Sequence, residues 1–322
     1  MTAHTFVTGA NGRVGQRLVS RLVADGHTVV GLARTNTKAE TVRSLGASCL
    51  VGDLSNSSVL DEGLAQAENV FHLAGALRGV GGETPDQINR LGTVNLCERL
   101  VKHPGVKRVI YTSSCAIYGD RSGQWLDEEM PPYPNTRYGR SKQQAEDVLL
   151  QMANQNKIDV RVVRLAAVYG PGFPFMLESL IRSGNAWLPG EGRNFVPTIH
   201  IDDAIEGLMK IRDTESTHQI YNLADPEPVT LSEFYGTIAR TIGSSPPRFW
   251  STWIPSYVQH WLARNNERIQ SKLPLKPKFT PDNLRLFTAS SRLKIDRMEE
   301  ELGMVWKYRS AKNGAEAAIH SQ

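Results

Sequence analysis

The sequence predicts an α/β fold, in which a doubly wound parallel sheet carries a smaller, mostly helical C-terminal lobe. Short apolar segments alternate with segments of helical periodicity through the first half of the chain. A glycine-rich turn joins the first apolar segment to the first helical one, and the second half turns to Gly, Pro and aromatic residues. Strands that alternate with helices pair in parallel, and ligands of such sheets bind beyond the carboxyl ends of the strands.

The expected strands are short and rich in Val, Ile and Leu. They cover residues 4–10, 27–34, 47–54, 69–75, 106–114 and 159–170. Helices are expected at 13–26, where apolar residues recur at helical spacing before a terminal Gly, and at 88–103. Residues 200–211 and 219–225 are expected to form a last helix and strand that return to the sheet.

Composition argues against several classes of protein. With 40% hydrophobic and 22% charged residues, the chain is typical of a soluble globular protein. Its net charge of +4 is small for 322 residues and its Lys and Arg are spread along the chain, so we expect no nucleic-acid partner. No apolar run is long enough to span a membrane and the chain start lacks a signal-peptide pattern, so we expect a cytoplasmic protein without membrane contact.

The three cysteines give no sign of a metal site. Cys49, Cys97 and Cys115 form no CxxC pair and have no His partner at metal-ligand spacing, so we expect no metal and a reduced setting. The aromatic segment 249–263 is interrupted by Ser, Gln and His. We interpret it as core or pocket wall, with a helix that dips into a membrane surface as the alternative.

The turn VTGANGRVG places Gly9, Gly12 and Gly15 between a strand and a helix. Glycine there allows a tight turn and the close approach of a pyrophosphate, and the helix start offers free N–H groups. A purely structural turn is the alternative. The strand before it, the helix after it and its place at the chain start favour dinucleotide binding.

The second expected strand ends in Ala33 and Arg34, where an NAD site usually carries an acidic residue. A guanidinium can bind a 2′-phosphate that a carboxylate would repel. We therefore expect NADP(H), with NAD(H) as the alternative, and Arg13 as a second clamp, although both arginines are also explained as solvated surface groups. Asp53 is a candidate for holding the adenine amine or for a simple turn role.

Tyr138 and Lys142, in YGRSK, lie one helical turn apart. A nearby ammonium favours the phenolate, so this tyrosine can exchange a proton with a substrate oxygen that the hydroxyl of Ser114 polarises. Taken alone, Tyr and Lys at this spacing are usually surface residues. The glycine turn and YTSS at 111–114 favour the catalytic interpretation.

Three further polar residues have weaker claims on the chemistry. Thr112 is the alternative hydroxyl. Asn89 is expected to hold a water in a proton relay or to start a helix, and His72 to be structural or to line the cofactor.

The motifs TGANGRVG, GDL, HLAG, YTSSCAIYG, YGRSK and RLAAVYGPG occur in the order seen in the extended short-chain dehydrogenase/reductase superfamily. The chain resembles this superfamily over about its first two-thirds, most closely the dihydroflavonol-reductase and 3β-hydroxysteroid-dehydrogenase-like members. The resemblance implies a Rossmann-type fold with Tyr138 as acid/base, Lys142 as the residue that lowers its pKa and holds the nicotinamide ribose, and Ser114 as the hydroxyl on the substrate oxygen. The cofactor contacts expected on this basis are Gly9, Asn11, Gly12, Arg13, Val14, Gly15, Arg34, Asp53, Leu54, Leu73, Ala74, Gly75, Asn89, Thr112, Tyr138, Lys142, Leu165 and Val168.

The change to Gly, Pro and aromatic residues after Tyr169 divides the chain. Residues 1–168, with 199–224 returning to them, are expected to bind the dinucleotide, and 169–198 with 225–322 to form the substrate-binding lobe. The expected substrate contacts are Ala76, Arg78, Ser114, Ala116, Tyr138, Phe173, Phe175, Met176 and Trp187, with Trp250, Trp253 and Trp261 as further candidates. Aromatic packing of the small lobe is the alternative. A homodimer formed through two helices, one of them bearing YxxxK, is also expected.

Three features favour a reductase of a hydrophobic ketone or aldehyde. Arg34 suggests NADPH, the usual donor for reduction. Val196 stands where nucleotide-sugar enzymes often carry an Arg for the substrate diphosphate, with Arg193 out of register. The expected walls are apolar.

Two other functions stay open: a nucleotide-sugar epimerase with retained NAD, and a dinucleotide-binding regulator without catalysis. The presence of Ser114, Tyr138 and Lys142 ranks the regulator last. Leu165 replaces the Pro often found in RPxxVYGPG, so the shape of the nicotinamide pocket does not follow from relatives.

Overall fold

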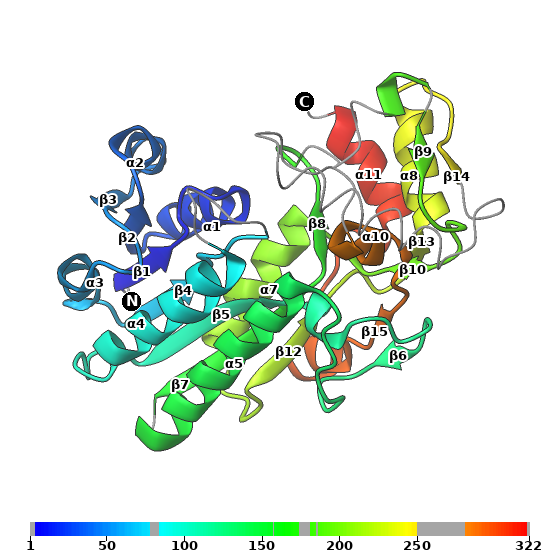
Figure 1. Cartoon of the computed structure of the whole chain (residues 1–322). Helices are drawn as coiled ribbons and strands as arrows, with labels where there is room; N and C mark the ends of the chain where they lie inside the picture. The colour runs from blue at the N-terminus through cyan, green and yellow to red at the C-terminus, as the bar shows by residue number, and fades with distance from the viewer. Residues whose placement is uncertain are drawn as a thin grey trace, which may run out of the picture.

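The computed structural model describes residues 4–77, 84–156, 158–173, 181–184, 186–249 and 281–320. Its centre is a parallel seven-stranded sheet in the order β12-β7-β5-β4-β1-β2-β3 (Figure 1). The strands are β1 (His4–Thr8), β2 (Thr28–Ala33), β3 (Ser48–Val51), β4 (Asn69–His72), β5 (Arg108–Ser114), β7 (Asp159–Leu165) and β12 (Ile220–Leu223). The winding reverses between β1 and β4, the point at which such sheets bind ligands.

Helices cover both faces of the sheet, and each face has its own apolar core. One face carries α1 (Arg13–Ala24), α2 (Asn36–Arg43) and α7 (Ile201–Asp213). The other carries α3 (Ser57–Leu64), α4 (Gly92–Leu100) and α5 (Arg137–Asn156), with a π-helical turn η1 (Gln87–Leu91) leading into α4. The predicted doubly wound parallel sheet is therefore confirmed.

The C-terminal lobe lies at the right of Figure 1, beyond the carboxyl ends of the sheet strands. Its helices are α8 (Leu231–Thr241), α10 (Pro281–Thr288) and α11 (Ala311–His320). The lobe also contains two small two-stranded sheets. In one, β9 (Trp187–Leu188) pairs with β14 (Arg248–Phe249), and in the other β10 (Phe195–Val196) pairs with β13 (Val229–Thr230). The lobe thus contains more strand than the sequence suggested.

The expected strand at 159–170 is divided in the structure. β7 ends at Leu165, and β8 (Ala167–Tyr169) pairs instead with β11 (Thr198–His200). The backbone changes partner within one residue, since Ala166 N–H donates to Leu223 O and Ala167 N–H to Pro197 O. A run of apolar residues gives no sign of such a change, because its side chains are buried equally well beside either neighbouring strand.

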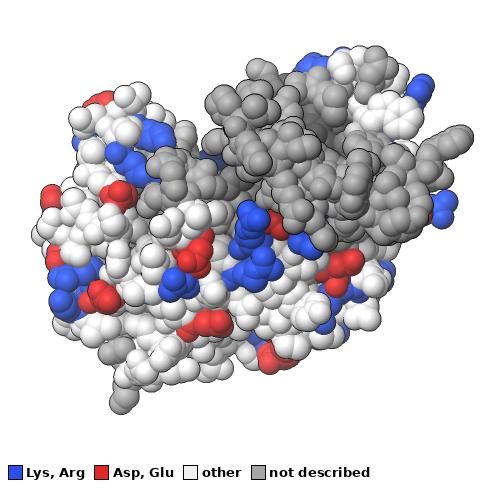
Figure 2. Space-filling model, viewed as in Figure 1, with Lys and Arg blue, Asp and Glu red and all other residues white. Residues whose placement is uncertain are grey.

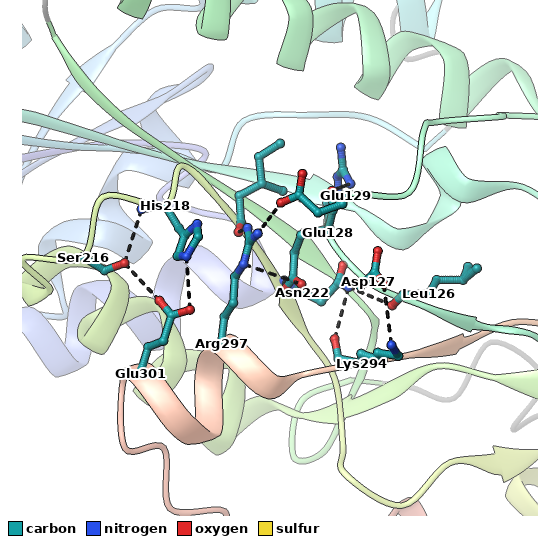
Figure 3. Close-up of polar contacts among 12 residues, drawn as sticks. Leu126, Asp127, Glu128, Glu129, Ser216, His218, Asn222, Lys294, Arg297 and Glu301 are labelled. Atoms are coloured by element: carbon teal, nitrogen blue, oxygen red, sulfur yellow. Dashed lines mark hydrogen bonds and ion pairs between the residues drawn. The ribbon is translucent and has the colours of Figure 1, made fainter.

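Polar contacts bind β12 to the end of the chain (Figure 3). The buried Asn222 side chain donates to the carbonyls of Leu126 and Lys294, each over 3.1 Å, and accepts from Tyr118 Oη over 2.8 Å. Lys294 follows β15 (Arg292–Leu293), which pairs with β6 (Trp125–Leu126). Arg297, in η3 (Arg297–Glu301), donates to Ile220 O and pairs with Glu129. The last part of the chain is in this way fixed to the outer strand of the sheet.

Asn222→Ala is expected to lower the free energy of unfolding by about 3 kcal/mol, because it removes three hydrogen bonds of a buried side chain: two to the carbonyls of Leu126 and Lys294 and one from the Tyr118 phenol. Denaturant unfolding measures this, with Asn313→Ala on the exposed face of α11 as the matched control. Equal, small effects for the two variants would show that the Asn222 contacts do not stabilise the fold.

The face shown in Figure 2 intersperses acidic and basic side chains over the described residues. No helix among those residues combines the length and apolar character that a membrane span requires.

Candidate active site

The glycine turn between β1 and α1 is shaped for a phosphate group. Gly9 has φ of 71°, and a Cβ there would lie 2.7 Å from Ala74 N. A Cβ on Gly15 would lie 2.2 Å from Gly9 O, and Gly12 caps α1 without a side-chain hydrogen bond. The N–H groups at the start of α1 are therefore not capped by a side chain, which fits the pyrophosphate of a dinucleotide.

A cavity of about 600 Å³ opens beside this turn, over the switch point of the sheet. Its lining includes nine of the predicted cofactor contacts: Gly9, Asn11, Gly12, Arg34, Asp53, Leu54, Leu73, Ala74 and Gly75. Ala76, predicted as a substrate contact, also lines this cavity, and the exposed Leu77 and Leu91 add an apolar wall that the sequence did not indicate. Arg13, Val14 and Gly15 lie next to the cavity in α1, and Arg13 has its guanidinium carbon 6.0 Å from the ring centre of Phe173.

The ends of β2 and β3 form the far wall of this cavity. Ala33 is buried, and the exposed Arg34 lines the cavity in its place. Asp53 accepts two hydrogen bonds from Ser55 through one carboxylate oxygen, at 2.8 Å from the backbone N and 2.5 Å from Oγ. The carboxylate therefore stabilises a turn, as the alternative for Asp53 predicted, while its residue still lines the cavity.

Lys142 lies buried among the residues predicted to be catalytic. Its Nζ donates to Thr112 O over 2.6 Å and lies 4.3 Å from the ring centre of Tyr111. A Cβ on Gly75 would be 3.5 Å from Nζ, so the glycine leaves room there. Burial lowers the pKa of Lys142 to about 7, and the negative charge of Glu146 opposes that shift.

Ser114 and Tyr138 face each other from the end of β5 and the start of α5. Ser114 Oγ accepts from Ala116 N–H over 3.2 Å at the start of the 3₁₀ turn η2 (Cys115–Tyr118). Burial raises the pKa of Tyr138 to about 12, and its hydrogen bond with Ser114 acts in the opposite direction. The phenol is thus protonated at neutral pH and can donate a proton.

The Asn89 side chain is engaged in hydrogen bonds to Ala76 and Ser141. Its Oδ1 accepts from Ala76 N–H over 2.7 Å, and its Nδ2 donates to Ala76 O and to Ser141 Oγ over 3.1 and 2.9 Å. Ser141 Oγ in turn donates to Tyr138 O over 2.8 Å. The sequence did not predict a role for Ser141, although its place beside Lys142 within YGRSK is a signal for one.

His72 is buried and structural. Thr93 Oγ1 gives its proton to Asn89 O, so His72 Nε2–H donates to Thr93 and Nδ1 accepts from Thr8. Burial, followed by the charge of Lys142, lowers the pKa of His72 to about 3. This neutral histidine joins β1, β4 and α4 behind the cavity, as one of its two expected roles predicted. Thr112 also points to β4, since its hydroxyl donates to His72 O over 3.3 Å.

Several predicted residues are not part of this group. Arg78, Phe175, Met176, Trp250, Trp253 and Trp261 lie outside the described residues. Trp187 is 46% exposed on β9, with Arg248 over its ring. Leu165 ends β7 and Val168 lies in β8, and both belong to the apolar core on the α1 and α7 face of the sheet, which Phe173 and Cys115 also border. No group of His, Cys, Asp and Glu in the described chain could hold a metal ion.

Comparisons with known proteins agree with the fold. A ketoreductase from Stigmatella aurantiaca that acts on 4-hydroxy-2-methyl-3-oxo-4-farnesyl-3,4-dihydroquinoline-1-oxide is 31% identical over 74% of this chain and 73% of its own. UDP-glucose 4-epimerase from Mycolicibacterium smegmatis is 28% identical over 76% of this chain and 86% of its own. UDP-glucuronic acid 4-epimerase from Bacillus cereus, solved with UDP-glucuronic acid and NAD, superposes with a TM-score of 0.77 at 20% identity over 98% of both chains.

The sequence model of the NAD dependent epimerase/dehydratase family matches residues 5–224, which hold the glycine turn, the cavity and the group around Lys142. The chain belongs to the NAD dependent epimerase/dehydratase family and is an NAD(P)-dependent enzyme that acts on CH–OH and C=O groups.

Proposed function

We propose that this protein is an NADPH-dependent reductase of a ketone or aldehyde, and in reverse an alcohol dehydrogenase. The observation that carries the proposal is the end of β2. Arg34 lines the cavity there, and the buried Ala33 takes the position of the usual acidic residue. A cation without a neighbouring carboxylate on this strand favours the 2′-phosphate that distinguishes NADPH from NADH.

The residues around Lys142 suit a carbonyl reduction. NADPH, when bound, supplies the hydride. Tyr138, protonated at neutral pH, donates its proton to the carbonyl oxygen, and the Ser114 hydroxyl donates a hydrogen bond to the same oxygen. Lys142, fixed by Thr112 O, stabilises the phenolate that remains and would hold the nicotinamide ribose. In this proposal the turn at Gly9, Gly12 and Gly15 holds the pyrophosphate.

A hydrophobic substrate is proposed on two grounds. Phe173, four residues after β8, is partly buried against the core and is proposed as an apolar wall of the substrate site, with Ala116 in η2 after β5 as a second one. The ketoreductase relative acts on a substrate whose name includes a farnesyl group and an oxo group. Within the proposal, residues 169–198 and 225–322 form the lobe that holds this substrate.

The test is an assay of NADPH consumption with a panel of hydrophobic ketones and aldehydes. We expect turnover of at least some members, formation of the alcohol, and slower turnover with NADH. Epimerisation of UDP-glucose by the protein with NAD, without net oxidation of cofactor and with no ketone reduced, would contradict the proposal. Nucleotide-sugar epimerisation is the function to exclude, because UDP-glucose 4-epimerase is among the relatives.

Arg34→Ala is expected to weaken NADPH binding about 10- to 100-fold, because it removes charge-assisted hydrogen bonds to a phosphate, and to leave NADH binding unchanged. Fluorescence titration with both cofactors measures this. Lys102→Ala, which removes an exposed cation outside the cavity lining, is the matched control. Equal losses for both cofactors would mean that Arg34 does not select the 2′-phosphate.

A further inference from the structure

A buried carboxylate lies one helical turn beyond Lys142. Tyr138, Lys142 and Glu146 follow one another at four-residue spacing, which puts them on one face of α5. The Glu146 side chain is 2% exposed, and Lys142 is also buried. An ionised carboxylate removed from water in this way needs a cation beside it.

Arg164 on β7 supplies one such cation. Its Nη2 lies 3.1 Å from Glu146 Oε2 and its Nε 3.4 Å from Oε1, and the guanidinium is 3% exposed. Its Nη1 donates to Tyr118 Oη over 2.8 Å and to Glu128 O over 3.1 Å. Tyr118 continues to Asn222, and so to the contacts drawn in Figure 3. Arg164 is therefore held in place independently of Glu146.

Glu146 stands one helical turn from Lys142 on the same face of α5, and its negative charge acts on the Lys142 ammonium. The other ionisable groups near Lys142 are Tyr111 on β5, His72 on β4, whose ring stacks on Tyr111, and Tyr138, one helical turn away on α5. All three are uncharged at neutral pH: burial raises the pKa of both tyrosines and lowers that of His72. In the described chain, the charge that counteracts the burial of Lys142 is that of Glu146.

We propose that Glu146 is a positioning residue that keeps Lys142 protonated, and that Arg164 limits this effect by sharing the carboxylate. The Glu146 carboxylate then interacts with two buried cations, Lys142 and Arg164. The pH range in which Lys142 is protonated depends on how strongly the carboxylate interacts with each of them. The proposal rests on the role given to Lys142 in the proposed function but on no particular substrate.

The test reads the ionisation of Lys142 directly. Protein labelled with ¹³C and ¹⁵N in lysine is titrated by NMR, with the Lys142 signal assigned by its absence in Lys142→Met. In Glu146→Gln we expect the titration midpoint of Lys142 to fall by about one pH unit or more, because the favourable charge is gone. In Arg164→Gln we expect a rise of about one unit, because Glu146 then pairs with Lys142 alone.

Opposite shifts distinguish this role from a structural one. If the pair only fastens α5 to β7, both variants lose thermal stability and the midpoint stays at its wild-type value, which would overturn the proposal. Glu128→Gln is the matched control. This carboxylate is also buried in the network, accepts from Asn222 N–H and has its charged neighbour in Arg297, so we expect no shift.

If one of the single variants does not fold, a double variant still tests the proposal. Glu146→Gln combined with Arg164→Gln removes both charges and keeps hydrogen-bonding groups, and we expect its midpoint below the wild-type value. An unchanged midpoint in this double variant would also overturn the proposal. The titration uses neither substrate nor cofactor, so failure to reduce ketones would refute the proposed function without affecting this result.

Discussion

Tyr138→Phe is expected to lower kcat on the order of 10³-fold while NADPH affinity stays close to that of the wild type. The substitution removes a single oxygen, the one that transfers the proton, and general acid–base catalysis by one side chain typically contributes 10²- to 10⁴-fold. The predicted cofactor contacts around the glycine turn and the Lys142–Thr112 bond do not involve this hydroxyl. Steady-state turnover with a substrate from the ketone panel and a separate NADPH titration measure the two quantities.

The control for this variant is Tyr133→Phe. Tyr133 is 69% exposed and precedes α5 by a few residues, so the same atom is removed near the site without touching the catalytic group. We expect turnover within about twofold of the wild type, as for other exposed substitutions. Turnover that survives Tyr138→Phe at a similar level would show that another group donates the proton, with Ser114 the first to examine.

Gly15→Ala is expected to abolish measurable cofactor binding. The added Cβ would lie 2.2 Å from Gly9 O and 2.8 Å from Ala10 O, and both atoms belong to the backbone of the phosphate turn. Neither can move aside as a flexible side chain would, so the start of α1 must separate from the turn. Titration with NADPH and NADH is expected to show the loss for both cofactors, and thermal unfolding to show a lower Tm.

Gly105→Ala provides the matched comparison, because a Cβ there meets no atom within 4 Å. We expect cofactor binding and Tm close to those of the wild type. If Gly15→Ala bound NADPH as tightly as Gly105→Ala, the helix start would not be where the pyrophosphate lies, and the cavity beside it would need another ligand.

The parts of the molecule that depend on local pattern could be predicted from the sequence. Strand and helix alternation predicted the parallel sheet, and Gly9, Gly12 and Gly15 predicted a turn at which added side chains clash with backbone. The spacing of Tyr138 and Lys142 predicted a shared helix face, and the structure brings Ser114 to it from β5.

What could not be predicted depends on contacts between distant segments. Glu146 continues the four-residue spacing of YxxxK, yet an acidic residue in a helix is ordinarily solvated. Only the partner on β7, Arg164, makes it a buried charge. The division of 159–170 between two sheet partners and the pairing of Trp187 on β9 with β14 likewise depend on contacts between distant segments.

The cofactor tests the proposed function most directly. The purified protein is denatured, any released nicotinamide nucleotide is identified, and protein stripped of nucleotide is titrated with NADPH and with NADH. The account predicts little retained nucleotide and tighter binding of NADPH than of NADH. NAD retained tightly through purification, with no preference for NADPH, would contradict the role of Arg34 and direct the search to nucleotide sugars.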